Sequence, residues 1–274
     1  MTGGQERSDS GVGPGGQERS DSGVGPGGQE RSDSGIGPVL ILTAHGSADP
    51  RSAAVTHAVA DEVRRLRGQL DVRVAFCERS TPNLRDVLVD LDGPAVLTPL
   101  LLASAYHARV DIPTMVAESA AGQRGEVLQA DTLGEDPRLI EVLHQRLIDV
   151  DVEPEHADTG VLVVAVGSSH AEANASTATL ASALTQRRGW ARVRVAYATA
   201  QPSVAEGIAE LRRSGARRIA LAPWFIAPGR ITDRVADVAA AEGVAMAEPL
   251  GAHTLLAETV LDRFDRAAAR RLAA

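Results

Sequence analysis

The chain has 274 residues, of which 44% are hydrophobic, and its formal net charge is −8. This size suits one large or two ordinary globular domains, and the acidic balance argues against a nucleic-acid-binding protein. All 28 basic residues are arginine, which excludes chemistry that needs a lysine. The single cysteine, Cys77, excludes an intrachain disulfide, and its scarcity is typical of a cytoplasmic protein.

The first part of the chain is repetitive and polar. Residues 3–38 are three copies of the unit GGQERSDSGVGP, with Ile36 replacing valine in the third copy. So few apolar side chains cannot offset the entropy lost on ordering, so we expect residues 1–38 to be a disordered tail. The tail does not have the composition of a secretory signal. No apolar stretch in the chain approaches the roughly 20 residues of a membrane helix, so we expect no contact with a membrane.

From residue 39 onward, short apolar runs alternate with amphipathic stretches, a pattern typical of strands that alternate with helices. The expected strands cover 39–44, 71–77, 95–102, 125–130, 160–166, 191–197, 217–225 and 244–248. The expected helices cover about 50–67, 82–91, 108–121, 136–149, 171–187, 203–214, 231–242 and 253–272. Strands that are apolar on both faces predict mainly parallel sheets flanked by helices, the α/β class.

The strand and helix order repeats about halfway along the chain. A polar stretch at 150–159 separates the copies, so we predict an N-terminal domain at 39–150 and a C-terminal domain at 158–274. Two similar α/β domains are expected to face each other across a shared cleft. Possible ligand residues distinguish the copies: Gly167 stands where the first half has His45, and Ala198 stands where it has Glu78. This asymmetry predicts one working site, in the first half.

Three side chains follow successive strands of the first half: His45, Glu78 and His107. Ligands bind beyond the carboxyl ends of parallel strands, so these side chains are expected at one edge of the sheet. Two imidazoles and a carboxylate suit Fe²⁺, Co²⁺, Ni²⁺ or Zn²⁺ and leave coordination positions open. Taken singly, a histidine after a strand is more often an ordinary loop residue, and Glu78 is compatible with a cap of the helix near Pro82.

The remaining histidines and the cysteine have weaker patterns. Surface or packing roles are expected for His57, His144, His156 and His253, whereas His170 lies close enough to the second strand–helix loop to face the shared cleft. Strand alternation turns Cys77 to the face opposite Glu78, which predicts a buried thiol.

The segments around these three residues, His45-Gly46-Ser47, Glu78-x-x-x-Pro82 and His107-x-x-x-Asp111-Ile112-Pro113, resemble the class II tetrapyrrole chelatases. These are the sirohydrochlorin cobalto- and ferrochelatases, and the resemblance covers roughly residues 39–274. It implies insertion of Fe²⁺ or Co²⁺ into a tetrapyrrole for siroheme or cobalamin-type cofactors, without ATP or another cofactor. By the same resemblance, His45, Glu78 and His107 line the active site, where they bind the metal and take up protons.

The implied substrate, sirohydrochlorin, carries eight carboxylates, which arginine can bind as a bidentate partner. Ser47, Arg51, Arg109 and Arg230 are therefore expected to contact it, and Arg79 and Arg234 lie near the same ends of the predicted strands. The sequence leaves open whether Fe²⁺, Co²⁺ or Ni²⁺ is inserted and which histidine is the base. A non-catalytic metal or tetrapyrrole binder and a two-domain anion-binding protein are the alternatives. A monomer is expected, since two fused halves can form a cleft by themselves.

Overall fold

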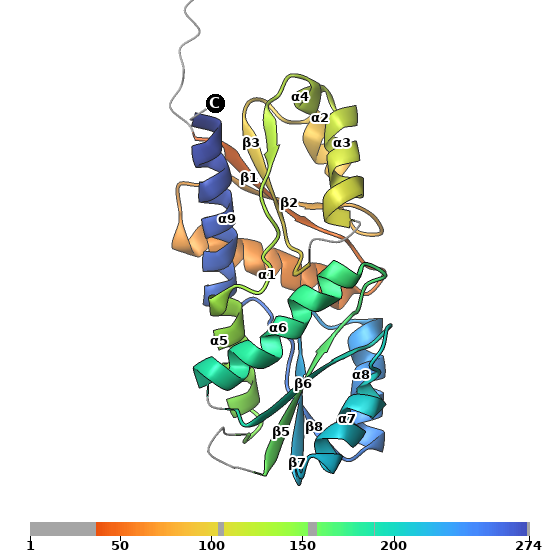
Figure 1. Cartoon of the computed structure of the whole chain (residues 1–274). Coiled ribbons are helices and arrows are strands. Elements are labelled where there is room, and N and C mark those ends of the chain that lie inside the picture. The colour runs from red at the N-terminus through yellow and green to blue at the C-terminus, as the bar shows by residue number, and fades with distance from the viewer. Residues whose placement is uncertain (1–36, 104–106, 153–157, 189, 273–274) are drawn as a thin grey trace, which may run out of the picture. The chain divides into compact units, whose positions relative to one another are not determined.

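Two four-stranded parallel sheets form the framework of the protein (Figure 1). The computed structural model describes residues 37–103, 107–152, 158–188 and 190–272. Residues 1–36 of the tail predicted at 1–38 lie outside the described residues, and so do residues 153–157 of the predicted linker. The predicted α/β class is confirmed, because every strand pairing in the described residues is parallel and helices lie on both faces of each sheet.

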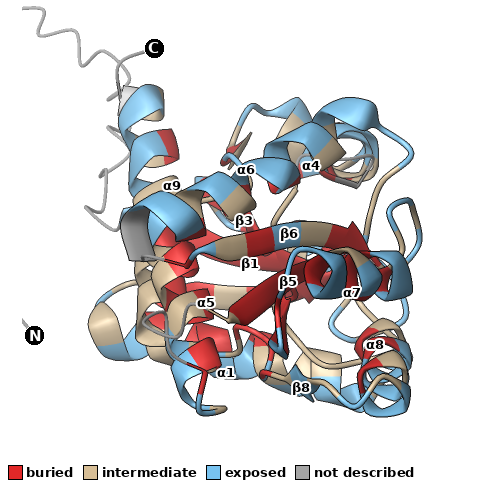
Figure 2. Cartoon of the chain, turned by 60° about the horizontal axis from the view of Figure 1, so that its bottom comes forward, coloured by how far each residue is buried: buried red, intermediate tan, exposed pale blue. Residues whose placement is uncertain are grey.

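The two sheets have the same strand order. The first, β2-β1-β3-β4, is formed by β1 (Val39–Ala44), β2 (Val72–Phe76), β3 (Ala95–Pro99) and β4 (Val127–Gln129). The second, β6-β5-β7-β8, is formed by β5 (Thr159–Ala165), β6 (Arg192–Tyr197), β7 (Arg218–Pro223) and β8 (Ala245–Met246). We call each sheet, with the helices packed on it, a lobe. The central strands β1 and β5 are buried along their whole length (Figure 2).

Capping side chains fix the first residues of several helices. The first half contains α1 (Pro50–Leu66), α2 (Leu84–Val89), α3 (Ile112–Glu118), α4 (Ala120–Gln123) and α5 (Pro137–Ile148). The second contains α6 (Ala171–Arg188), α7 (Val204–Arg213), α8 (Arg230–Ala241) and α9 (Thr254–Leu272). Asp49 and Asp136 each accept a hydrogen bond from the backbone N–H two residues later, with proline at the first helical position. Such caps satisfy amides that a helix leaves unpaired at its start.

The last helix of each half packs on the sheet of the other half. The C-terminal helix α9 lies against α1, β3 and β4 of the first lobe, and α5 lies against α6 and β7 of the second (Figure 1). One continuous apolar core therefore includes Leu42 of β1, Leu143 of α5, Val163 of β5 and Val260 of α9. Each sheet has a second apolar core on its other face. In the first lobe this core lies beneath α2–α4, and in the second it lies beneath α7 and α8. The structure thus joins residues 37–274 into one compact unit.

The helix predicted at 108–121 is divided into three pieces. A π-helical turn, η1 (His107–Asp111), comes first, and α3 and α4 follow. Pro113 has no N–H, so it cannot donate the hydrogen bond that would continue a regular helix through this point. Ser119 is extended at ψ 150° and caps α4 by accepting from the N–H of Gly122. Among the described residues, no helix has the length and apolarity needed to span a membrane.

Candidate functional site

The loops after β1 and β2 hold each other in a fixed register. The N–H of Glu78 donates to the carbonyl of His45 at 3.0 Å, and the N–H of Cys77 donates to the carbonyl of Ala44 at 3.0 Å. Gly46 has φ +93°, and a Cβ there would lie 1.7 Å from the Glu78 carbonyl oxygen. Glycine is required at this position, since it alone tolerates both that φ and that approach.

This backbone register brings the His45 and Glu78 side chains together. His45 Nε2 lies 3.2 Å from Glu78 Oε1, and Arg79 Nε donates to the same oxygen at 2.9 Å. Both members of the His45–Glu78 pair are partly exposed, at 39% and 46% of their side-chain surface. The pair is therefore open to a ligand from solvent, and imidazole with carboxylate is a donor set suited to divalent first-row metals.

The pair faces a cleft of about 390 Å³ that both lobes line. The first lobe contributes the loop from His45 to Ala48 and Glu78 with Arg79. The opposite wall is the loop from Ala227 to Thr232 at the start of α8, together with Phe225. The predicted cleft between two α/β lobes is thus present, and the Ala-Pro-Gly-Arg loop, which has no ligand residues, forms its far wall.

His107 is the first residue of η1, but its side chain lies outside the described residues. Among the side chains that the structure describes, no group of three His, Cys, Asp or Glu is close enough to hold a metal ion. The structure therefore brings together two of the three predicted ligands, His45 and Glu78. The metal-binding role of all three stays a prediction.

The four residues predicted to contact substrate have different surroundings. Ser47 and Arg230 line the cleft. Arg51 is held from two sides: it binds Asp49 on its own loop and pairs with Asp233 of α8, with Arg51 to Asp233 distances of 2.6 and 3.1 Å. Arg51 thus bridges the two lobes.

Arg109 lies farther along the first lobe, in η1. It is 3.7 Å from Glu172 near the start of α6, and both side chains are largely exposed. Neither Arg51 nor Arg109 is among the described residues that line the two cavities between the lobes.

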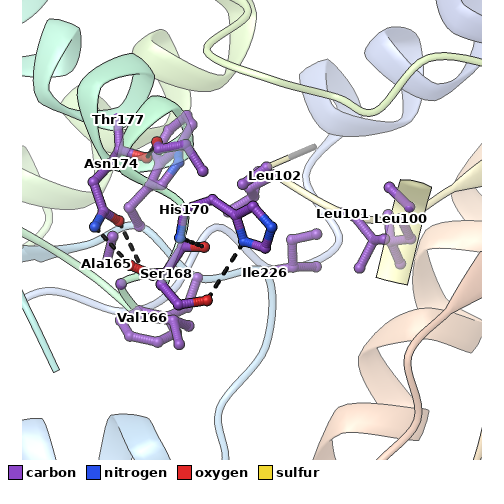
Figure 3. Close-up of a pocket in the computed structure, with 17 residues that line it drawn as sticks. Leu100, Leu101, Leu102, Ala165, Val166, Ser168, His170, Asn174, Thr177 and Ile226 are labelled. Carbon is purple, nitrogen blue, oxygen red and sulfur yellow. Dashed lines mark hydrogen bonds between the residues drawn. The ribbon is translucent and has the colours of Figure 1, made fainter. Parts of the chain in front are cut away.

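A second, mainly apolar cavity of about 470 Å³ lies between the end of β3 and the β5–α6 loop (Figure 3). Leu100, Leu102 and Ile226 supply apolar surface, and Figure 3 shows the His170 ring turned toward the same space. The expectation that His170 faces the space between the lobes is confirmed. Phe225 lines this cavity as well as the cleft beside His45.

The structure corrects the register assumed between the two halves. The N–H of Ala198 donates to the carbonyl of Ala165, and the N–H of Thr199 donates to the carbonyl of Val166. The structural counterparts of His45 and Glu78 are therefore Val166 and Thr199, so matching His45 to Gly167 and Glu78 to Ala198 was wrong by one residue. The β6–α7 loop is one residue shorter than the β2–α2 loop, which hid the shift. The asymmetry itself remains, since neither counterpart is a common metal ligand.

The other histidines make packing contacts where they are described. His144 accepts a hydrogen bond from the buried Trp190 indole at 3.3 Å, His57 packs edge-on against Phe76, and His253 accepts the N–H of Leu255 at the start of α9. His156 lies outside the described residues. Burial raises the pKa of the Cys77 thiol to about 11, and the charges of Asp111 and Glu78 add to the rise. Cys77 is buried, as predicted.

Sequence reasoning missed Ser80, which fixes the loop that carries the site. Its hydroxyl accepts from the N–H of Ser47 at 3.1 Å and donates to the carbonyl of Ser47 at 3.0 Å. Both residues follow neighbouring strands, but nothing in the sequence specifies the contact. Phe225 was missed for a similar reason, because it ends an apolar run that reads as a strand.

Imidazole with carboxylate is a donor set for divalent transition metals, and a cleft between two lobes is a common place for a small ligand, so the fold and the pair define a protein with the features of a metal- and ligand-binding site. The chain belongs to the CbiX family: the family model, described as CbiX, matches residues 39–150 and 160–267. The predicted family is therefore confirmed, and both halves carry its pattern.

Two named relatives match more than two thirds of the chain, and a shorter one matches less of it. A sirohydrochlorin ferrochelatase of Priestia megaterium is 26% identical over 207 residues, which are 72% of this chain and 76% of the relative. A sirohydrochlorin cobaltochelatase of the same organism is 22% identical over 73% of this chain and 67% of the relative. A shorter cobaltochelatase of Methanothermobacter thermautotrophicus is 27% identical over 39% of this chain but 89% of its own length.

Solved structures share the fold. SirB from Bacillus subtilis with Fe³⁺ superposes with a TM-score of 0.74 at 19% identity, over 87% of this chain and 98% of that one. SirB from Bacillus subtilis subspecies spizizenii in complex with cobalt gives 0.71 at 17% identity, with the same coverage. The two-lobed arrangement is therefore the one found in these chelatase structures.

Proposed function

We propose that this chain is a sirohydrochlorin chelatase, a lyase that inserts Fe²⁺ or Co²⁺ into the macrocycle. The observation that carries this proposal is the His45–Glu78 pair, 3.2 Å apart, in a cleft between the two lobes of a CbiX-family fold. A relative named ferrochelatase and a relative named cobaltochelatase each match more than two thirds of the chain, and this supports both ions as substrates. The product then serves siroheme or cobalamin-type cofactor synthesis.

The chemistry needs a cation held next to the ring and an acceptor for two pyrrole N–H protons. A neutral imidazole does both, and its ordinary pKa lies near neutral pH. In the proposed reaction His45 and Glu78 hold the incoming ion on the first lobe, with His107 as the third ligand. As the ion moves onto the ring nitrogens, the basic groups of this set take the released protons.

The two cavities differ in ways that suit different parts of the substrate. The cleft beside His45 contains Arg79 and Arg230, which can bind the carboxylates of the macrocycle rim. The cavity lined by Leu100, Leu102 and Ile226 offers apolar surface for a flat ring. One chain supplies both walls, which supports a monomer as the working unit, and the proposed reaction needs neither ATP nor a resident cofactor.

The direct test follows sirohydrochlorin absorption anaerobically with Fe²⁺ or Co²⁺ in separate runs. Wild type is expected to accelerate insertion, and His45→Ala to lose at least 100-fold of that rate. Thr199→Ala, at the structural counterpart of Glu78, serves as a matched control and should retain it. No acceleration with either ion from folded wild-type protein would contradict the proposal and favour a non-catalytic binder.

A further inference from the structure

Glu78 Oε1 lies between two cationic or potentially cationic groups. His45 Nε2 is 3.2 Å away, and Arg79 Nε donates to the same atom at 2.9 Å. An oxygen in this position has part of its lone-pair capacity taken by the guanidinium. The positive charge beside it also opposes an arriving cation. The charge of the Glu78 carboxylate, a predicted metal ligand, is therefore partly neutralised by the adjacent Arg79.

The backbone holds Arg79 in this place. Its φ is +58°, a left-handed conformation that is unfavourable for any residue with a side chain. Hydrogen bonds fix the loop on both sides: Glu78 donates its N–H to His45, and the Ser80 hydroxyl bonds both the N–H and the carbonyl of Ser47. Uncommon backbone conformations held this firmly are concentrated at functional positions. The second-lobe loop has no arginine at this place: Ala200 follows Thr199 there.

The Arg79–Glu78 pair is easily exchanged for another partner. The two side chains are 63% and 46% exposed, and exposed ion pairs are weak because water screens them. Arg79 lines the cleft, and Arg230 lines its opposite wall. Arg51 is already bound to Asp49 and Asp233. A carboxylate-rich ligand that enters the cleft can therefore take the place of Glu78 on Arg79, and it can also bind Arg230 on the opposite wall.

We infer that Arg79 is a positioning residue that couples macrocycle binding to metal capture. In the empty cleft its guanidinium holds Glu78 and lowers the affinity for a divalent cation. When a substrate carboxylate binds the guanidinium, Glu78 Oε1 is released toward the metal. Binding of the macrocycle thus precedes and promotes metal binding. This inference rests on the proposed function, which supplies the carboxylate-bearing substrate.

The first test measures Co²⁺ affinity of the full chain without any macrocycle. Arg79→Gln is expected to bind Co²⁺ about fivefold more tightly than wild type, a size typical of coupling between neighbouring sites. Arg79→Lys keeps the charge and should stay within about twofold of wild type. Arg194→Gln, which breaks an exposed arginine–glutamate pair on β6 and α7, is the matched control and should change nothing.

A double-mutant cycle shows whether the effect passes through Glu78. In the Glu78→Gln background, Arg79→Gln should raise Co²⁺ affinity much less than in the wild-type background, because only the repulsion from the Arg79 charge is then removed. A merely structural role for Arg79 predicts no such dependence. Three outcomes would overturn the inference. The first is unchanged or weaker Co²⁺ binding in Arg79→Gln, and the second is an equal gain from Arg79→Gln in the Glu78→Gln background. The third is no measurable Co²⁺ binding to either wild type or Arg79→Gln.

Steady-state kinetics separate this inference from the proposed function. With saturating sirohydrochlorin, the KM of Arg79→Gln for Co²⁺ should equal that of wild type, because the substrate has already displaced Arg79 there. Its KM for sirohydrochlorin should rise severalfold, with kcat within about threefold. If wild type does not accelerate insertion, the proposed function fails, and the Co²⁺ titrations still decide whether Arg79 controls Glu78.

Discussion

Gly46 and Glu78 approach each other so closely that any side chain at position 46 would collide with the Glu78 carbonyl, at 1.7 Å from a Cβ. The contact sets the relative height of the two loops that carry His45 and Glu78. A residue without functional groups therefore controls the geometry of the pair.

Replacing Gly46 with alanine should damage stability and activity together. The added methyl must push the Glu78 backbone away and hold φ near +93°, which we expect to cost about 2–4 kcal/mol of unfolding free energy. Insertion should fall at least 100-fold as His45 and Glu78 separate. Gly243→Ala is the control, because Gly243 also has positive φ but nothing lies within 4 Å of its Cβ position. Urea unfolding and the absorption assay measure the two effects; full activity in Gly46→Ala would contradict this role.

The carboxylate of Glu78 should matter through its charge. Glu78→Gln keeps the size of the side chain but weakens both metal binding and proton uptake. We expect Co²⁺ affinity and insertion rate each to fall at least tenfold with stability nearly unchanged, because the pair is about half exposed. Calorimetric titration with Co²⁺ and thermal unfolding test this. Wild-type metal affinity in Glu78→Gln would show that Glu78 is not a metal ligand.

The pair Arg51–Asp233 joins the lobes beside the cleft. We predict that Asp233 competes with the proposed substrate for Arg51. Asp233→Asn should lower the melting temperature by no more than about 2 °C, since both side chains are about half exposed. It should also lower the KM for sirohydrochlorin two- to threefold by freeing one side of Arg51. Asp265→Asn, which breaks the exposed Arg67–Asp265 pair between α1 and α9, should leave KM unchanged. A raised KM in Asp233→Asn would instead give Asp233 a supporting role.

Asp136 gives the protein a specific acid sensitivity. Burial raises the pKa of this carboxyl, but hydrogen bonds from Arg138 and the charge of Arg263 overcome that effect and lower the pKa to about 2. A folded pKa below the unfolded value of 3.8 stabilises the protein above pH 4, and the stabilisation is lost as the pH falls toward 2. The shift corresponds to about 2 kcal/mol.

Asp136→Asn should therefore be less stable than wild type by about 2 kcal/mol at pH 7. The difference should shrink steadily between pH 4 and pH 2. Denaturant unfolding at several pH values measures it. An Asp136→Asn penalty that stays constant down to pH 2 would mean that the carboxyl acts only as the cap of α5.

Much of the fold follows from local sequence. The strand centred on Leu40–Leu42 is apolar on both faces and could only be a buried parallel strand. The apolar pattern predicts a single helix at 108–121, whereas Pro113 and Ser119 divide this segment in the structure. The exchange of α5 and α9 left no local signal, since an amphipathic helix shows that it packs but not on which sheet.

The site was predictable only in part. Placing His45 and Glu78 at the ends of adjacent parallel strands put them at one edge, and the structure has them in contact. Their second-half counterparts were misread by one residue for two reasons. Val166 continues the apolar run of β5 into the position that matches His45, and the β6–α7 loop is one residue shorter than the β2–α2 loop. The charge of Arg51 and its place near the end of a predicted strand predict a substrate contact, and only the folded chain reveals its partner Asp233 on the other lobe.

The crossing of α5 and α9 ties the fate of each half to the other. A chain cut between the halves would give two fragments, and the last helix of each would be one that packs on the other fragment. One face of each sheet would then be exposed to water. Neither fragment would be expected to fold alone, but the two expressed together could rebuild the whole, each supplying the helix that the other lacks. The same crossing restricts hinge motion, because opening the lobes would strip both helices from the sheets that they cover. The width of the cleft between the lobes is therefore set during folding.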